Sequence, residues 1–224
     1  QSRGLGDVYK RQELIVAVKE GGSADPAYNS RLATVITKAK AANMPNDNIK
    51  RTIDKALGSG NTDNYESVTY EGYGPGGVAV IVETMTDNRN RTAGSMRHHF
   101  DKFGGNLGQM GCVGFMFTQK GVIVVDLEDK DPDELMMDAL DAGAEDMQAD
   151  GPVFEITTDP DSFNDVVKAL EEKGYSFESA EIEMVPQNYI VMTSEDDVRS
   201  MTKLLDMLDD NEDVQNVWHN WQQD

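Results

Sequence analysis

The densest group of polar side chains in the sequence lies in residues 86–92 (TDNRNRT). It brings Arg89 and Arg91 to the expected start of a helix, where free backbone N–H groups already favour anions. Arg97 adds a third positive charge further along the same helix. Two guanidinium groups at such a helix end are suited to a phosphate or an RNA backbone. The cluster consists of Thr86, Asp87, Asn88, Arg89, Asn90, Arg91 and Thr92.

The same cluster has a purely structural interpretation. Asp87 and Asn90 are side chains that cap helices, and an arginine on a helix surface commonly pairs with a nearby acid. In that interpretation Arg89 and Arg91 hold the fold together and bind nothing. The residue types alone do not choose between the two interpretations.

A second basic set lies nearer the start of the chain, on two short expected helices. Its members are Arg31, Lys38, Lys40, Lys50, Arg51 and Lys55. Six cations on two helices indicate a surface that faces phosphate, although a solvated helix face is the plainer alternative. Tyr28 is the only aromatic residue on these helices, so stacking on bases has little support.

Two glycine-rich segments could in principle cradle a phosphate. The first is GYGPGG, with Gly72, Gly74, Pro75 and Gly76, and the second is GGNLG, which begins with Gly104 and Gly105. Neither ends in the Gly-Lys-Ser/Thr of a phosphate-binding loop. We therefore expect them to be structural turns, with glycines that adopt positive φ.

Catalysis and metal binding have weak support in the sequence. The acidic run 126–134 lacks the central Gly and the terminal Glu of a calcium loop. His98, His99 and His219 are not spaced with Cys112 as zinc ligands, and Cys112 lies in an apolar pattern typical of a buried thiol. We expect no catalytic residue, no metal, no cofactor and no small-molecule substrate.

The charge is strongly polarised along the chain. The net charge is −21, yet residues 1–60 hold ten Lys and Arg against six Asp and Glu, whereas residues 121–224 hold five against twenty-nine. Because an acidic surface repels phosphate, any nucleic-acid contact is expected in the first half. The acidic second half either keeps the protein soluble or binds a basic protein partner.

The elements that must position these residues follow from apolar spacing. Helical spacing predicts helices over 12–20, 26–43 and 45–57, with Gly58-Ser59-Gly60 as a linker. Beyond residue 64 the spacing changes to that of strands, at 67–73 and 78–85, followed by a helix at 91–103 and a strand at 112–117. No apolar run is long enough to span a membrane, no secretory leader is evident, and a single cysteine fits a reducing compartment. These features predict a cytoplasmic protein.

Residues 120–185 show the order β-α-β-β-α-β, which is that of ferredoxin-like domains. A further strand at 189–192, a helix at 195–208 and a strand at 214–218 follow. We therefore expect an α+β fold, in which a small helical domain at 1–60 precedes two ferredoxin-like domains. The second domain comprises 65–119 plus 187–224, and the third, at 120–186, is inserted in it. This division requires the final strand to pair with the strand at 78–85.

Four segments together resemble the YebC family. They are AANMPNDNIKRTIDKA (41–56), YEGYGPGGVAVIVETMTDNRNRT (70–92), FDKFGGNLGQMGCVGFMF (100–117) and LLDMLDDNEDVQNVWHN (204–220). The resemblance implies three domains, a cytoplasmic location, no catalytic activity and no cofactor. It also implies a role in gene expression, either as a transcriptional regulator that binds DNA or as a translational activator at the ribosome.

One segment departs from the family pattern. Members of the family usually begin with a basic stretch, whereas residues 1–12 (QSRGLGDVYKRQ) do not match it. We expect this start to be truncated or foreign. A missing basic stretch would weaken binding to nucleic acid, because it would add positive charge where contact is expected.

Overall fold

The computed structural model describes residues 3–57, 65–128 and 130–223, with side chains from residue 10 onward. The predicted linker Gly58-Ser59-Gly60 lies outside these residues. The chain forms two compact units, one of residues 1–61 with 119–183 and the other of residues 62–118 with 184–224. Among the described helices, none is long and apolar enough to cross a membrane.

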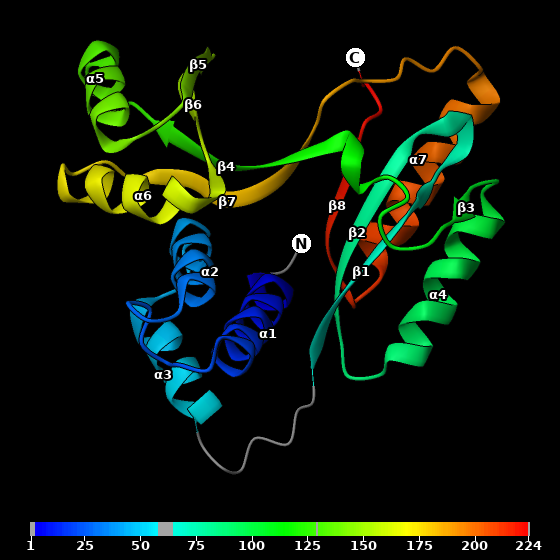
Figure 1. The fold of residues 1–224 in the computed structure, drawn as a ribbon, viewed down its shortest axis with the longest axis horizontal. Coiled ribbons are helices and arrows are strands. Elements are labelled where there is room, and N and C mark those ends of the chain that lie inside the picture. The colour runs from blue at the N-terminus through cyan, green and yellow to red at the C-terminus, as the bar shows by residue number, and fades with distance from the viewer. Residues whose placement is uncertain (1–2, 58–64, 129, 224) are drawn as a thin grey trace. The chain divides into compact units, whose positions relative to one another are not determined.

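The first unit begins with three helices, α1 (Arg3–Gly21), α2 (Ser30–Ala41) and α3 (Asn46–Leu57) (Figure 1). Their apolar faces share a core that includes Leu14, Leu32 and Ile49. The buried Asn29 caps α2: its side-chain oxygen accepts from the Leu32 N–H, and its amide donates to the Ala17 carbonyl at 2.8 Å. This cap starts α2 at Ser30, four residues later than expected.

The rest of the first unit is a four-stranded antiparallel sheet with two helices on one face. Its elements are β4 (Phe117–Asp126), α5 (Pro132–Ala142), β5 (Asp146–Asp150), β6 (Val153–Thr158), α6 (Phe163–Glu172) and β7 (Phe177–Pro186). The strand order β5-β6-β4-β7 is the ferredoxin-like one for this succession of elements. Its core includes Ile123, Leu135, Ile156, Phe163 and Leu170, all fully buried.

The second unit holds the other four-stranded antiparallel sheet, with the order β3-β1-β2-β8. Its elements are β1 (Glu66–Tyr73), β2 (Ala79–Thr86), α4 (Arg89–Lys102), β3 (Asn106–Leu107), α7 (Glu195–Asp210) and β8 (Val214–His219). Helices α4 and α7 cover one face, where Val80, Val82, Met96, Phe100 and Leu204 are buried. Residues 108–117 fold back over the other face, where Val113 and Phe117 pack on Ala79 and Ile81.

Two predicted strands of this unit are wrong. Residues 112–116 form a turn and a short 3-10 helix at Gly114–Met116, because the Glu71 carboxylate takes the backbone N–H groups that a strand would have donated. At 189–192 there is a single bridge, from Ile190 to Trp221, in place of a strand.

The α+β class, with helices first and two antiparallel sheets after them, is confirmed. Strand β8 pairs with β2, for example Trp218 opposite Ile81. The division into three domains with the predicted bounds stays a prediction.

Candidate nucleic-acid interface

The cluster at 86–92 ties together the end of β2, the start of α4 and the turn before β8. Thr86 and Thr92 are fully buried, and their hydroxyl oxygens lie 2.7 Å apart. Thr92 also donates to Asp213, whose oxygen is 2.8 Å away. The helix cap is Asn88, which accepts from the Arg91 N–H, so the expected caps Asp87 and Asn90 were wrong. The polar side chains of the cluster therefore form hydrogen bonds that hold these three segments together.

Arg91 is held by carboxylates. Its guanidinium lies 3.0 Å from Asp87 and 3.3 Å from both oxygens of Asp213. Asp213, followed by the hydrogen bond to Asp87, raises the pKa of Arg91 above its usual value. A 470 Å³ pocket adjoins it, lined by Asp87, Glu212 and Asp213 among others. A phosphate arriving there would meet three acids around one arginine.

The other two cations of this region are less engaged. Arg89 lies 3.8 Å from Glu66 in an exposed pair. Arg97 is exposed, with no ion pair to another described residue. Exposed pairs of this kind contribute only about 0–1 kcal/mol, and Glu66 adds a further acid beside Arg89.

The helical cations divide into two groups. Arg31 pairs with Glu20, and Lys38 lies 3.3 Å from Glu13 and 3.6 Å from Glu181. The second group is exposed and forms no ion pair within the described part of the chain. Its members are Lys40, Lys50, Arg51 and Lys55.

Three cations of that second group lie on α3. Ile49 and Thr52 are buried on its inner side, which leaves Lys50, Arg51 and Lys55 on the outer side. Arg51 and Lys55 are four residues apart and therefore neighbours on the helix surface. Asp47 and Asp54 share this outer side, so the face is mixed, with a net charge of about +1.

The glycine motifs serve packing. A Cβ on Gly72 would lie 2.6 Å from the Asn106 carbonyl oxygen, and one on Gly105 would lie 2.5 Å from that of Tyr73. A Cβ on Gly74 would meet the Met201 sulfur. Gly76 and Gly104 have φ of +74° and +80°, which only glycine adopts at low cost, and Pro75 is buried between the turn glycines.

Two acids that organise this unit were missed at the level of sequence. The Glu71 side chain is buried and accepts from the N–H groups of Gly111 at 2.6 Å, Gly114 at 2.5 Å and Val113 at 3.3 Å. Asp213 holds Thr92 and Arg91. Neither had a local signal, because Glu71 alternates like a solvent-facing strand residue and Asp213 sits in an acidic run.

Cys112 and His99 are partly buried and engaged in packing. Burial, and then the nearby Glu71, raises the pKa of the Cys112 thiol, which makes it a poor nucleophile. Burial lowers the pKa of His99, whose Nε2 lies 3.1 Å from the Asn211 amide. Among the described residues no group of three His, Cys, Asp or Glu could hold a metal ion.

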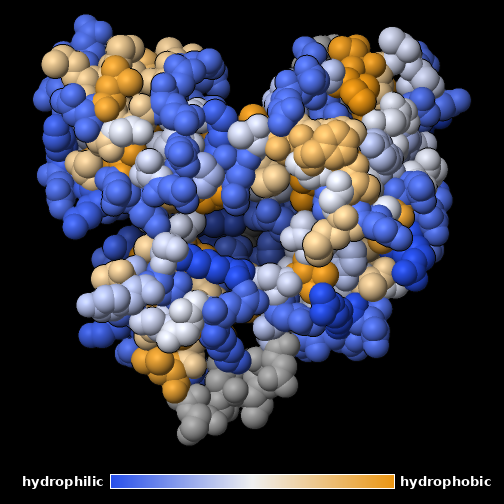
Figure 2. Space-filling view, viewed as in Figure 1, coloured by the Kyte–Doolittle hydropathy of each residue, from blue (hydrophilic) through white to orange (hydrophobic). Residues whose placement is uncertain are grey.

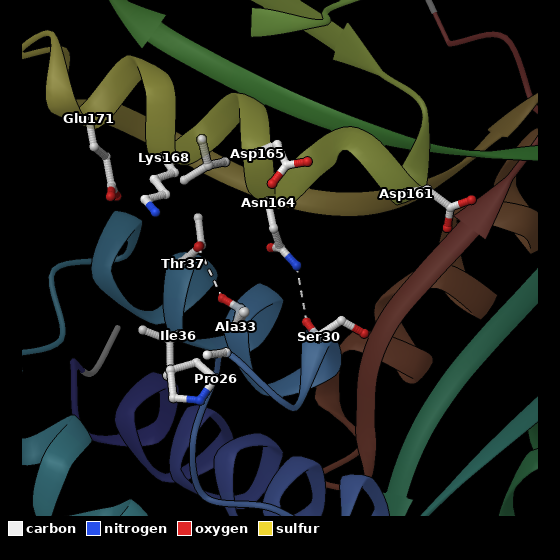
Figure 3. A pocket seen from close by; sticks show the side chains of 12 residues that line it. Pro26, Ser30, Ala33, Ile36, Thr37, Asp161, Asn164, Asp165, Lys168 and Glu171 are labelled. Atoms are coloured by element: carbon white, nitrogen blue, oxygen red, sulfur yellow. Dashed lines mark hydrogen bonds between the residues drawn. The ribbon is translucent and has the colours of Figure 1, made fainter.

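A 540 Å³ pocket lies between α2 and α6 in the first unit (Figure 3). Asn164 spans the two helices there: its amide donates to the Ser30 carbonyl and its oxygen accepts from Thr34. The charged groups at the pocket are Asp161, Asp165, Glu171 and Lys168. This excess of carboxylates disfavours phosphate.

Comparison with known proteins places these features in a family. Residues 10–59 match the TACO1/YebC protein N-terminal domain, and residues 65–221 match the TACO1/YebC second and third domain. A protein of Acetivibrio thermocellus named "Probable transcriptional regulatory protein" is 58% identical over 94% of this chain and 87% of its own length. A Clostridioides difficile protein with a similar name is 56% identical over 93% and 87%.

A solved structure supports the same assignment. The crystal structure of a conserved hypothetical protein from Aquifex aeolicus is 42% identical and has a TM-score of 0.81, covering 97% of this chain and 90% of that one. Together the family matches and the relatives show that the chain belongs to the TACO1/YebC family.

Proposed function

We propose that this chain is a non-enzymatic, cytoplasmic regulator of gene expression that binds nucleic acid through the outer side of α3. The observation that carries the proposal is a set of exposed cations that form no ion pair with any described residue: Lys50, Arg51 and Lys55 on α3 and Lys40 at the end of α2. Such ammonium and guanidinium groups can bind phosphates and release their counterions, because no ion pair within the protein has to break first.

The first candidate target is duplex DNA. The two relatives quoted above are named as probable transcriptional regulatory proteins, and a helical domain with exposed cations is compatible with that role. Such a role requires sequence preference, which comes from contacts to base edges in addition to phosphates.

The second candidate target is structured RNA at the ribosome. The outer side of α3 favours it, because Asp47 and Asp54 lie between the cations and would face the phosphates that flank a DNA groove. A mixed face can still take isolated phosphates of folded RNA, which is recognised largely by shape.

One pair of variants tests the proposal. Arg51→Glu with Lys55→Glu places two acids on α3, and Arg199→Glu with Lys203→Glu makes the same charge change on α7 as a matched control. Binding to duplex DNA by mobility shift and to ribosomes by co-sedimentation should weaken at least tenfold in the α3 variant and little in the control.

The outcomes separate the candidates. DNA binding that discriminates a target sequence from competitor and depends on α3 supports transcriptional regulation. Ribosome co-sedimentation that depends on α3, without discrimination among DNA sequences, supports translational activation. Equal loss in both variants would mean that only net charge matters, and no loss in either would remove α3 from the interface.

A further inference from the structure

Helix α5 carries an apolar stripe on its solvent side. Met136, Met137 and Leu140 are 43%, 66% and 53% exposed, and they are three of the nine large apolar side chains exposed among the described residues. Leu140 lies three residues after Met137 and four after Met136, so the three side chains are neighbours on the helix surface. In Figure 2, orange surface stands among blue where Figure 1 draws α5.

The fold does not need this stripe. The core contacts of α5 come from Leu135 and Ala139, which are buried on its inner side. The helix start is already stabilised by Asp131, which caps it, and by Pro132 in its first turn. Three large apolar groups facing water therefore have no structural role within the described residues.

Acids surround the stripe. Asp133, Glu134 and Asp141 each lie three or four residues from a member of it. Residues 119–183 as a whole hold twenty Asp and Glu against four Lys. Two of those lysines are paired, Lys120 with Glu145 and Lys173 with Asp138, and Lys130 lies over the Tyr175 ring.

We propose that the stripe on α5 is the docking surface for a protein partner that presents a basic amphipathic helix. The apolar side of such a helix would cover Met136, Met137 and Leu140, and its lysines or arginines would face Asp133, Glu134 and Asp141. Methionine suits this contact, because its unbranched thioether adapts to partners of different shape. In this mode of binding, an amphipathic helix places its apolar side on an apolar surface that has an acidic border.

Charge argues for this occupant over the alternatives. A second copy would bring another strongly acidic unit against the first, and an anionic membrane surface would be repelled in the same way. A basic helix gains both from apolar burial and from charge complementarity. The stripe lies on a different element from the cations of α3, so a failure of the nucleic-acid proposal leaves this one standing.

The probe is a fluorescein-labelled 15-residue peptide of Leu and Lys, arranged as an amphipathic helix and titrated into the full chain. A peptide of the same composition, scrambled to abolish the apolar side, separates helix recognition from general attraction to acid. We expect the amphipathic peptide to bind about tenfold more tightly, a ratio that corresponds to a modest buried apolar contact.

The variants locate the contact. Met136→Gln, Met137→Gln and Leu140→Gln together should remove that tenfold preference. Met110→Gln, Phe115→Gln and Val191→Gln, which change comparably exposed apolar residues of the other unit, should leave it intact. In the unaltered chain, hydrogen exchange of the α5 amides should slow when the amphipathic peptide is added.

Three results would overturn the proposal. They are equal affinity for the two peptides, a preference that survives the α5 substitutions, and sedimentation that shows a dimer which those substitutions dissolve. The last result would identify a second copy of the chain as the occupant.

Discussion

The two sheets of this molecule are stabilised in different ways. The β3-β1-β2-β8 sheet and its connections bury Glu71, Thr84, Thr86, Thr92 and Asn220. In residues 119–183, which hold most of the β5-β6-β4-β7 sheet and both of its helices, the buried polar residue among those described is Thr158. The β3-β1-β2-β8 sheet depends on hydrogen bonds that fasten loops and turns to strands. The β5-β6-β4-β7 sheet depends on an apolar core beneath a charged surface.

This difference helps to distinguish residues that build the fold from residues that are available to bind a partner. Three motifs stand out in the sequence: GYGPGG, TDNRNRT and GGNLG. All three lie in the second unit and help to build it. Binding is better sought where side chains have no structural role. Within the described residues such side chains include the unpaired cations on α3 and the apolar stripe on α5.

The largest expected effect comes from Glu71. Glu71→Gln replaces a buried acceptor of three N–H groups with an amide that turns its own N–H toward them, and it should destabilise the second unit by about 3 kcal/mol. Urea unfolding followed by tryptophan fluorescence measures this unit alone, since Trp218 and Trp221 both belong to it. Glu66→Gln, at an exposed pair, is the control, and an equal effect there would contradict the distinction.

A smaller effect is expected at the start of α4. Thr92→Val keeps the shape but removes the hydroxyl that joins Thr86 to Asp213, and it should cost about 2 kcal/mol in the same fluorescence measurement. Thr69→Val, on the exposed side of β1, should change stability by less than about 0.5 kcal/mol. If the two variants matched, the cluster would not be a structural clamp.

The smallest effect belongs to the charged sheet and depends on pH. Burial, and then the neighbouring Glu181 and Glu155, raises the pKa of Glu183 to about 7, while Lys38 of α2 faces Glu181. The folded state thus keeps a proton that the unfolded chain releases near pH 4.5, so stability is lost as the pH rises from about 4.5 to 7.

Glu183→Gln should therefore stabilise this unit by about 1 kcal/mol at pH 8, a figure reduced for partial exposure, and by nothing at pH 4. Hydrogen exchange of the β7 amides at the two pH values checks this, with Glu178→Gln, at an exposed residue of the same strand, as control. A benefit that is equal at both pH values would assign the effect to packing.

The sequence predicted the fold class because apolar spacing encodes helices and strands directly. The order β4-α5-β5-β6-α6-β7 follows from that spacing, and so does the position of α4. Residues 112–116 were mistaken for a strand, because what bends them is Glu71, some forty residues away. A contact over that distance in the chain leaves no mark on local periodicity.

The site was only partly accessible for the same reason. The sequence shows that Arg91 is a cation. It does not show that Asp213, 122 residues further along the chain, is the partner of that cation. The availability of Arg51 and Lys55 on α3 likewise required the positions of their neighbours. Spacing predicts which face of a helix is exposed, but not which charges on that face are already paired.

The most direct test of this account is the salt dependence of nucleic-acid binding in two matched neutralised variants, Arg51→Gln with Lys55→Gln and Arg89→Gln with Arg91→Gln. Each phosphate contact contributes about 0.9 to the slope of log affinity against log salt. We predict that this dependence becomes less steep by about 2 in the variant of Arg51 and Lys55. We expect no change in its steepness in the variant of Arg89 and Arg91. A fall confined to the α4 variant would contradict the account, because the TDNRNRT cluster would then recognise phosphate and not merely build the fold.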